Sequence, residues 1–195
     1  IRKISLKINY SRFVPFYRLK IKIKNEIVTL GKRDIKVIEK TGKFVSPKDW
    51  REVINNKDIK IIDTRNQYEI EIGKFKNSIN INMDSFRDFP ELIKKIKLKK
   101  EDEIAMYCTG GIRCEKASSY LIKKGFKNIL QLDGGILNYL NYIKDSEEKS
   151  VWKGECFVFD NRVSVNKNLK KGSFDQCYGC RYPITNKEKK SKFFK

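Results

Sequence analysis

One stretch constrains the fold of this chain more than any other, because it places a cysteine between a strand-like run and a helix-like run. An apolar run at residues 104–107 leads into the loop Cys108-Thr109-Gly110-Gly111-Ile112-Arg113, and a helical pattern follows over residues 115–124. Glycines permit backbone conformations that turn several N–H groups inward. A helix N-terminus and an arginine both favour the thiolate form of a nearby cysteine, which is the reactive form. The pattern therefore predicts a nucleophilic Cys108, and the competing interpretation is an ordinary turn with a buried core cysteine.

Helix-like and strand-like patterns alternate on both sides of this loop, which indicates an α/β domain with a mostly parallel sheet. The expected helices cover residues 46–55, 67–72, 90–97, 114–124 and 136–143, and the expected strands cover residues 59–63, 79–81, 104–107 and 128–132. Ser46 and Pro47 are typical of a helix start, and Gly125 of a helix end. Asp63 and Cys108 both end strands in this arrangement, where the ligand sites of such sheets lie.

Composition divides the chain into three parts. Residues 1–41 form a basic, β-rich N-terminal part, residues 42–145 form the α/β domain, and residues 146–195 form a C-terminal extension. A period-two pattern at residues 19–24 puts three lysines on one face of a predicted strand, either solvated or in contact with phosphates; these are Lys20, Lys22 and Lys24. In the extension, the aromatic stretch at residues 152–163 is too short to fold alone, so we expect it to pack against the α/β domain.

Positive charge is concentrated at the two ends of the chain. The formal net charge is +20, with +9 in residues 1–40, +7 in residues 164–195 and only +4 in residues 41–163. This distribution favours a polyanionic partner, and nucleic acid ahead of a membrane because no long amphipathic helix is evident. The competing explanation is a codon bias toward Lys, Asn and Ile, which accounts for the total charge better than for its segregation.

The chain contains five cysteines and no histidine. An odd number of cysteines cannot all pair internally, so a reduced, cytoplasmic protein is the simpler expectation. No run approaches the ~18 apolar residues of a membrane span. The missing histidine excludes a Cys–His dyad, a Ser-His-Asp triad and a two-histidine-one-carboxylate iron site within this chain. Any thiolate must therefore be stabilised by backbone dipoles and arginine.

The length of the cysteine loop separates two classes of cysteine enzyme. Cys108 to Arg113 is one residue shorter than the loop that cysteine phosphatases wrap around a phosphate, and a tighter ring suits a sulfur-borne group or a smaller electrophile. The segment resembles the active-site loop of a rhodanese domain. A second rhodanese signature is similar to Asp63-Thr64-Arg65 followed by Glu69, Gly73 and residues 78–81. The resemblance implies a rhodanese-like parallel sheet flanked by helices, in which Arg65 and Glu69 are structural and Asp63 could serve either role.

Further motifs resemble one rhodanese-containing group, the tRNA uridine hydroxylases, over nearly the whole chain. They lie at residues 13–16, 20–31, 46–50, 62–69, 86–90, 108–116 and 152–160 and at the pair Cys177/Cys180. The block at residues 152–160 is especially specific because ordinary rhodaneses lack it. Members are usually longer at both ends, so we expect residues 1–41 to be part of an α+β, ferredoxin-like domain.

This resemblance implies an enzyme that hydroxylates the wobble uridine in the anticodon of tRNA to 5-hydroxyuridine. Cys108 would be the essential, persulfide-forming cysteine, and the backbone of residues 109–113 would stabilise its negative charge. Molecular oxygen would be the co-substrate, the electron donor is unknown, and no bound cofactor is identifiable in the sequence. Two alternatives are a sulfurtransferase that carries a persulfide on Cys108 and a non-catalytic RNA-binding module.

The remaining cysteines allow more than one interpretation. Cys114 lies six residues after Cys108 and is either a redox partner or a buried residue of the first helical turn. Cys177 and Cys180 form a CxxC pair, but structural zinc needs four ligands. Without histidine, only Cys156, Cys114 or a partner chain could complete such a zinc site.

Overall fold

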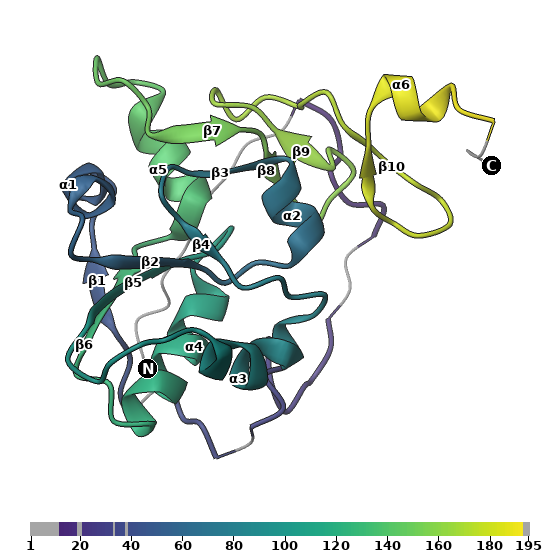
Figure 1. The fold of residues 1–195 in the computed structure, drawn as a ribbon. Coiled ribbons are helices and arrows are strands. Elements are labelled where there is room, and N and C mark those ends of the chain that lie inside the picture. The colour runs from purple at the N-terminus through teal and green to yellow at the C-terminus, as the bar shows by residue number, and fades with distance from the viewer. Residues whose placement is uncertain (1–11, 19–20, 33, 38, 193–195) are drawn as a thin grey trace.

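The computed structural model describes residues 12–192 apart from 19, 20, 33 and 38. Its centre is a five-stranded parallel sheet in the order β1-β6-β5-β2-β4 (Figure 1). The strands of this sheet are β1 (Lys43–Val45), β2 (Lys60–Asp63), β4 (Ile79–Asn80), β5 (Glu103–Tyr107) and β6 (Asn128–Leu132). Four of the five match the predicted strands to within one residue, whereas β1 was not predicted.

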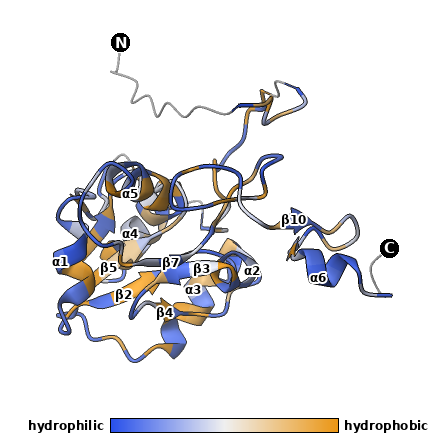
Figure 2. Ribbon diagram, turned by 90° about the horizontal axis from the view of Figure 1, so that it is seen from above, coloured by the Kyte–Doolittle hydropathy of each residue, from blue (hydrophilic) through white to orange (hydrophobic). Residues whose placement is uncertain are grey.

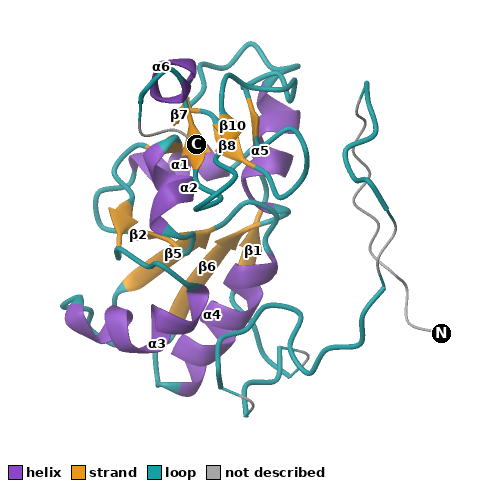
Figure 3. Cartoon of the chain, turned by 90° about the vertical axis from the view of Figure 1, so that its right-hand side faces the viewer, coloured by secondary structure: helices purple, strands orange, loops and turns teal. Residues whose placement is uncertain are grey.

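Helices cover both faces of this sheet. They are α1 (Trp50–Asn55), α2 (Gln67–Glu71), α3 (Phe89–Leu92), α4 (Ile112–Lys123) and α5 (Gly135–Ile143). Figure 3 shows α3 and α4 on one face of the sheet, and α1 and α5 on the other. Gly125 follows α4 with a φ of +90° and donates its N–H to the carbonyl of Ile122, so the predicted end of this helix is confirmed.

The hydrophobic core has two halves, one on each side of the sheet. On β5, Ile104 and Met106 pack with residues of α3 and α4, whereas Ala105 and Tyr107 pack with residues of α1 and α5. Successive side chains of a strand point to opposite faces, so a strand covered by helices on both faces is apolar throughout. Figure 2 shows β2 and β5 largely in orange, whereas α1 is drawn partly in blue and partly in orange.

The C-terminal extension forms short antiparallel strand pairs, the first of which joins it to the α/β domain. The pairs are β3 (Gly73–Phe75) with β7 (Trp152–Gly154), β8 (Cys156–Phe157) with β9 (Ser164–Val165), and β10 (Asp175–Gln176) with β11 (Pro183–Ile184). The short helix α6 (Asn186–Lys189) follows. Trp152, Cys156 and Val158 are buried in the same core as Trp50, so the predicted packing of residues 152–163 is confirmed. The part boundaries at 41/42 and 145/146 stay predictions.

The predicted N-terminal strand is wrong. Among the described residues of 12–42 none is in a strand, and Ile21 and Ile23 are exposed. Alternation of apolar and polar residues produces a strand only where a neighbouring strand supplies hydrogen bonds, and none pairs with the described part of this segment. Lys22 and Lys24 are exposed in this irregular segment, and Lys20 lies outside the described residues.

Two predicted helices have different bounds. In place of the helix expected at residues 90–97, the structure has the short α3 between two 3-10 turns, η1 (Phe86–Asp88) and η2 (Ile93–Lys95). The helical segment ends before residue 97 because Ile96 adopts an extended backbone. α1 begins at Trp50 rather than near Ser46, since residues 46–49 form a turn in which the Asp49 N–H donates to the Ser46 carbonyl. Within the described ranges, no helix has the length and apolar character needed to cross a membrane.

Candidate active site

Cys108 directly follows β5 and starts the loop that leads into α4. Its side chain is buried, and the N–H of Gly111 donates to its Sγ at 3.1 Å. Gly111 has a φ of +92°, in the left-handed region that glycine adopts without steric cost. The predicted inward turn of the loop backbone is therefore present at Gly111.

The N-terminus of α5 holds the loop from outside. The N–H groups of Ile136 and Leu137 donate to the carbonyls of Cys108 and Thr109 at 2.9 and 3.1 Å. These bonds direct two loop carbonyls away from the thiol. Gly135 lies against the loop so closely that a Cβ there would be 2.4 Å from the Cys108 carbonyl oxygen and 2.7 Å from the Gly111 nitrogen. The Gly134-Gly135 turn after β6 is therefore part of the loop's support.

The guanidinium of Arg113 forms a two-point ion pair with the buried carboxylate of Glu69. The two N–O distances are 2.6 and 2.7 Å. The Thr109 hydroxyl donates to the same carboxylate at 3.2 Å. Glu69 also accepts the backbone N–H of Asn66 in the capping box of α2. One carboxylate thus ties α2 to both ends of the loop.

A second buried ion pair lies at the end of β2. Arg65 and Asp63 are fully buried and 2.7 Å apart, and Arg65 also donates to the carbonyls of Glu69 and Gly73. The polar atoms of both side chains form hydrogen bonds within the protein, close to the residues that hold the cysteine loop. The expectation that Arg65 is structural agrees with these contacts, and Asp63 is its partner.

Two thiols, Cys108 and Cys114, interact at the centre of the site. Burial raises the pKa of Cys108, but a hydrogen bond from Cys114, the charge of Arg113 and the backbone N–H groups of both residues outweigh burial and hold that pKa well below its ordinary value. Burial and the neighbouring Cys108 raise the pKa of Cys114 well above its ordinary value. Cys114 also lies 3.5 Å from the hydroxyl of Thr64. The pair therefore combines a thiolate at Cys108 with a protonated donor at Cys114.

A cleft of about 560 Å³ opens over this thiolate. Five of the six predicted loop residues line it, namely Cys108, Thr109, Gly110, Ile112 and Arg113. Its other walls come from both flanking parts of the chain and from α5; they are formed by Pro15, Phe16, Val28, Leu137, Val158, Phe159, Asp160 and Arg162. Phe16 and Phe159 expose 59% and 63% of their surface. The guanidinium of Arg113 lies 5.8 Å from the ring centre of Phe159.

Other predicted site residues lie outside this cleft. Lys22 and Lys24 do not line it. Cys177 and Cys180 flank the tip of the β10–β11 hairpin, where Cys180 is exposed. Across the part of the chain that the structure describes, no group of three or more potential metal ligands of the His, Cys, Asp or Glu type comes together. The CxxC pair therefore supplies two of the four ligands that structural zinc needs.

The sequence analysis missed several residues that build the site. Phe16, Phe159 and Arg162 line the cleft, and Gly135 supports the loop. Phe16 and Phe159 lie within motifs that the sequence analysis did identify, but nothing local indicated that these motifs would reach the cysteine. Glu69 was assigned a structural role only, and it also binds the loop arginine.

Comparisons with known proteins agree with this architecture. Residues 46–142 match the family described as the rhodanese-like domain. The chain is similar to a rhodanese-related protein from Thermoplasma volcanium, with 29% identity and a TM-score of 0.42 over 52% of this chain and 93% of that chain. It is also similar to the Bacillus anthracis protein CoADR-RHD, with 26% identity and a TM-score of 0.42 over 50% of this chain and 16% of that chain.

A third similar structure is the single-domain sulfurtransferase RDL2 of Saccharomyces cerevisiae. Its identity is 22% and its TM-score is 0.45, over 53% of this chain and 93% of that chain. Together with the parallel sheet flanked by helices, the family match confirms the predicted α/β rhodanese-like fold.

Proposed function

Because residues 46–142 form a rhodanese-like domain, we propose that this chain uses Cys108 to modify tRNA, by oxygen-dependent hydroxylation of the wobble uridine to 5-hydroxyuridine. In this reaction one oxygen atom enters the C5–H bond of uracil and the other leaves as water. Two electrons and two protons come from a donor outside this chain. The thiolate of Cys108, or the persulfide formed on it, is the reactive group.

One observation carries this proposal: the cleft over Cys108 is completed by segments that lie outside the rhodanese-like domain. Phe16 precedes the domain and Phe159 follows it, and both line the cleft with more than half of their surface exposed. Exposed aromatic side chains stack on unpaired bases, which is how proteins commonly hold single-stranded RNA. The cleft volume lies within the ~300–1,000 Å³ range of typical ligand pockets. Aromatic walls of this kind suit a nucleobase better than an inorganic sulfur donor.

Charge supports the same partner. The net charge of +20 is concentrated in residues 1–40 and 164–195, on either side of the rhodanese-like domain. A polyanion that reaches the cleft from either terminal part would meet this charge.

The decisive experiment supplies purified protein with tRNA, oxygen and a chemical reductant and analyses the nucleosides by mass spectrometry. We expect the wobble uridine to gain one oxygen with wild-type protein and Cys180→Ser, whose thiol lies outside the cleft, but not with Cys108→Ala. An unchanged wobble uridine with wild-type protein would refute the proposal.

A matched pair of aromatic variants tests the base-binding wall. Phe159→Ala removes a ring from the cleft, whereas Phe44→Ala removes a comparably exposed ring from β1. Stacking contributes about 1–3 kcal/mol per base, so we expect Phe159→Ala to weaken binding of an anticodon stem-loop roughly 5- to 150-fold. Equal affinities of the two variants would contradict the proposal that the aromatic wall of the cleft binds a base.

A sulfurtransferase is the second candidate. The observation that favours it is that the thiolate loop and its supports, from Asp63 to Leu137, all lie within the matched domain. In that reaction Cys108 would take the outer sulfur of thiosulfate as a persulfide, release sulfite and pass the sulfur to an acceptor thiolate or cyanide. Thiocyanate formation from thiosulfate and cyanide, without any change in tRNA, would favour this candidate.

A further inference from the structure

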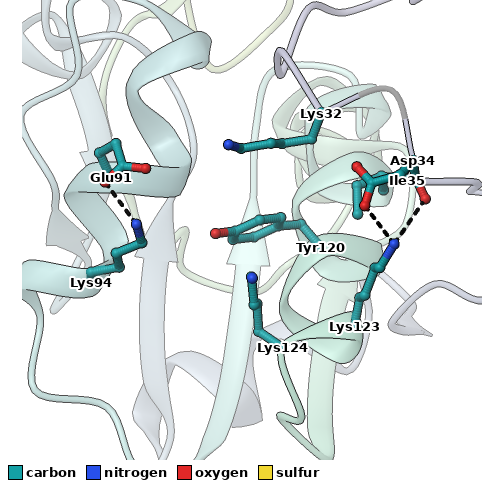
Figure 4. Close-up of a pocket in the computed structure, with 8 residues that line it drawn as sticks. All are labelled: Lys32, Asp34, Ile35, Glu91, Lys94, Tyr120, Lys123 and Lys124. Atoms are coloured by element: carbon teal, nitrogen blue, oxygen red, sulfur yellow. Dashed lines mark hydrogen bonds and ion pairs between the residues drawn. The ribbon is translucent and has the colours of Figure 1, made fainter.

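A second hollow lies at the opposite end of α4 from the cysteine. It has a volume of about 350 Å³ and is lined by four lysines around one tyrosine, which we call the lysine groove: Lys32, Lys94, Lys123, Lys124 and Tyr120. Figure 4 shows the ammonium groups of Lys32 and Lys124 on opposite sides of the Tyr120 ring, and both residues line the same hollow. The groove brings together the N-terminal part, the segment around α3 and the last turn of α4.

Two carboxylates at this groove are already paired. Lys123 contacts Asp34 at 2.5 Å, and Lys94 contacts Glu91 at 2.7 Å. Both ion pairs are more than half exposed, and exposed pairs contribute little to stability. Their lysines can therefore exchange a carboxylate for another anion at small cost.

The other two lysines give the groove its excess positive charge. Within the described ranges, neither Lys32 nor Lys124 has a carboxylate within ion-pair distance; the ammonium of Lys124 lies 5.7 Å from the ring centre of Tyr120. Four ammonium groups against two carboxylates leave a formal charge of +2. No cysteine, serine or threonine lines the groove, so its residues favour binding an anion over chemistry on it.

Lysines rather than arginines indicate what kind of anion fits. An ammonium is a compact point charge that contacts phosphate without the fixed two-point geometry of a guanidinium. Contacts of this kind hold a nucleic-acid backbone in position without reading its sequence. A bilayer surface is a poorer match, since these ammonium groups surround a hollow that a flat headgroup layer does not enter.

The groove and the cleft are connected by α4. Ile112 and Arg113, at the start of α4, line the cleft, and Tyr120, Lys123 and Lys124, at its end, line the groove. The helix has 12 residues, so its two ends are about 18 Å apart. An RNA strand spans this distance, whereas thiosulfate or another small sulfur donor does not.

We propose that the lysine groove binds backbone phosphates of the same RNA whose target nucleotide occupies the cleft at Cys108. This inference rests on the proposed function for the identity of the polyanion. The groove is an anchoring surface, separate from the reacting atoms, and its contribution is affinity.

The test compares two double variants that change the net charge equally. Lys32→Gln/Lys124→Gln neutralises the two lysines without carboxylate partners in the groove, and Lys57→Gln/Lys60→Gln neutralises two exposed lysines at the start of β2. Binding of a labelled anticodon stem-loop RNA is measured by fluorescence anisotropy at several salt concentrations. Urea unfolding of each variant confirms that these exposed substitutions leave the fold intact.

Each lost phosphate contact reduces the dependence of log K on log salt by about 0.7–0.9. We expect the groove variant to bind more weakly, about tenfold at low salt, with a salt slope smaller by about 1.4–1.8. The salt slope of the control variant should differ from that of wild type by less than half of the change expected for one lost phosphate contact. The alkylation rate of Cys108 should be the same in all three proteins, because the groove does not touch the thiol.

The outcomes separate this inference from the proposed function. If wild-type protein makes 5-hydroxyuridine but the two double variants bind RNA equally, the groove inference is wrong and the function stands. If the groove variant alone loses affinity but no protein makes product, the groove inference stands and the function is wrong. If the groove variant loses binding to phosphatidylserine vesicles and keeps full RNA affinity, the groove serves a membrane and the inference is overturned.

Discussion

Arg113, in the first turn of α4, and Glu69, in α2, form a buried two-point ion pair with N–O distances of 2.6 and 2.7 Å. The charge of Arg113 still favours the Cys108 thiolate, but Glu69 neutralises part of it. Hydrogen bonds to the thiolate, from Cys114 and from the Gly111 N–H, therefore contribute more to its stabilisation than the sequence alone suggested. The ion pair itself fixes the far end of the loop to α2.

Removing the carboxylate of this ion pair should destabilise the fold. Glu69→Gln leaves Arg113 buried without a charged partner, and breaking a buried pair from one side costs about 3–5 kcal/mol. Glu71→Gln on the same helix changes an exposed carboxylate bound to Gln67 and should alter stability by no more than about 0.5 kcal/mol. Urea unfolding measures both values, and similar midpoints for the two variants would contradict the assignment of Glu69.

The reactivity of Cys108 should show its lowered pKa. An unperturbed cysteine has a pKa of about 8.5, so the alkylation rate of Cys108 in folded protein should be half-maximal at a lower pH and fall about tenfold per pH unit below that point. Iodoacetamide labelling read by mass spectrometry at each cysteine measures this profile. Protein unfolded in urea provides the control, because there the midpoint of Cys108 should return to about 8.5.

The same shift has a defined effect on stability. Because the folded protein holds the pKa of Cys108 below its unfolded value, the thiolate contributes its full stabilisation above about pH 8.5 and loses it as the pH falls through the folded pKa. Cys108→Ala should therefore flatten the rise in unfolding free energy over that range. An unchanged pH dependence would show that folding does not lower the pKa of Cys108.

Local sequence patterns predicted most strands of the parallel sheet, because β2, β5 and β6 are short apolar runs. The helices between them are amphipathic or end at a glycine. The three-residue β1 was missed because it gains its hydrogen bonds only from β6, which lies about 85 residues further along the chain. The strand predicted at residues 19–24 failed for the converse reason, since a period-two pattern does not provide a partner strand. In the site, Cys108 was found from one contiguous motif, whereas the contact of Glu69 with Arg113 and the approach of Phe159 depend on tertiary packing.

Gly135 should not tolerate a side chain. Alanine there would place a Cβ 2.4 Å from the Cys108 carbonyl oxygen, with a φ of +67°. Gly31→Ala is the matched control, because Gly31 also has a positive φ, +74°, but a Cβ there meets no atom within 4 Å. Both variants bear the strain of a left-handed residue, about 1–2 kcal/mol. Only Gly135→Ala adds overpacking, about 1–3 kcal/mol.

Displacement of the loop should also separate these two glycine variants in reactivity. Gly135→Ala moves the carbonyl that α5 holds, so the Gly111 N–H should lose its alignment with the thiolate and the alkylation midpoint of Cys108 should rise. Gly31→Ala should leave this midpoint unchanged. Identical midpoints in both variants would mean that α5 does not position the loop.

Cys114 should act as the hydrogen-bond donor to Cys108 in reduced protein. Cys114→Ala removes that donor, so the pKa of Cys108 should rise and its alkylation midpoint should move to higher pH. Cys156→Ala is the control, since burial raises the pKa of this core thiol to about 12 and it does not line the cleft. If the midpoint is the same in both variants, the donor role is wrong.

The same variant decides between the two interpretations of Cys114 left open by the sequence. A redox partner would form a disulfide with Cys108 when the protein is treated with a stoichiometric amount of peroxide, and the intact mass would fall by two hydrogens in wild-type protein but not in Cys114→Ala. A donor alone would leave Cys108 as a sulfenic acid that dimedone captures in both proteins. Burial alone favours the protonated form of Cys114, also when Cys108 is oxidised, so Cys114 attacks the sulfenic acid slowly. We therefore expect dimedone adducts on Cys108 in wild-type protein, and a quantitative Cys108–Cys114 disulfide would overturn this expectation.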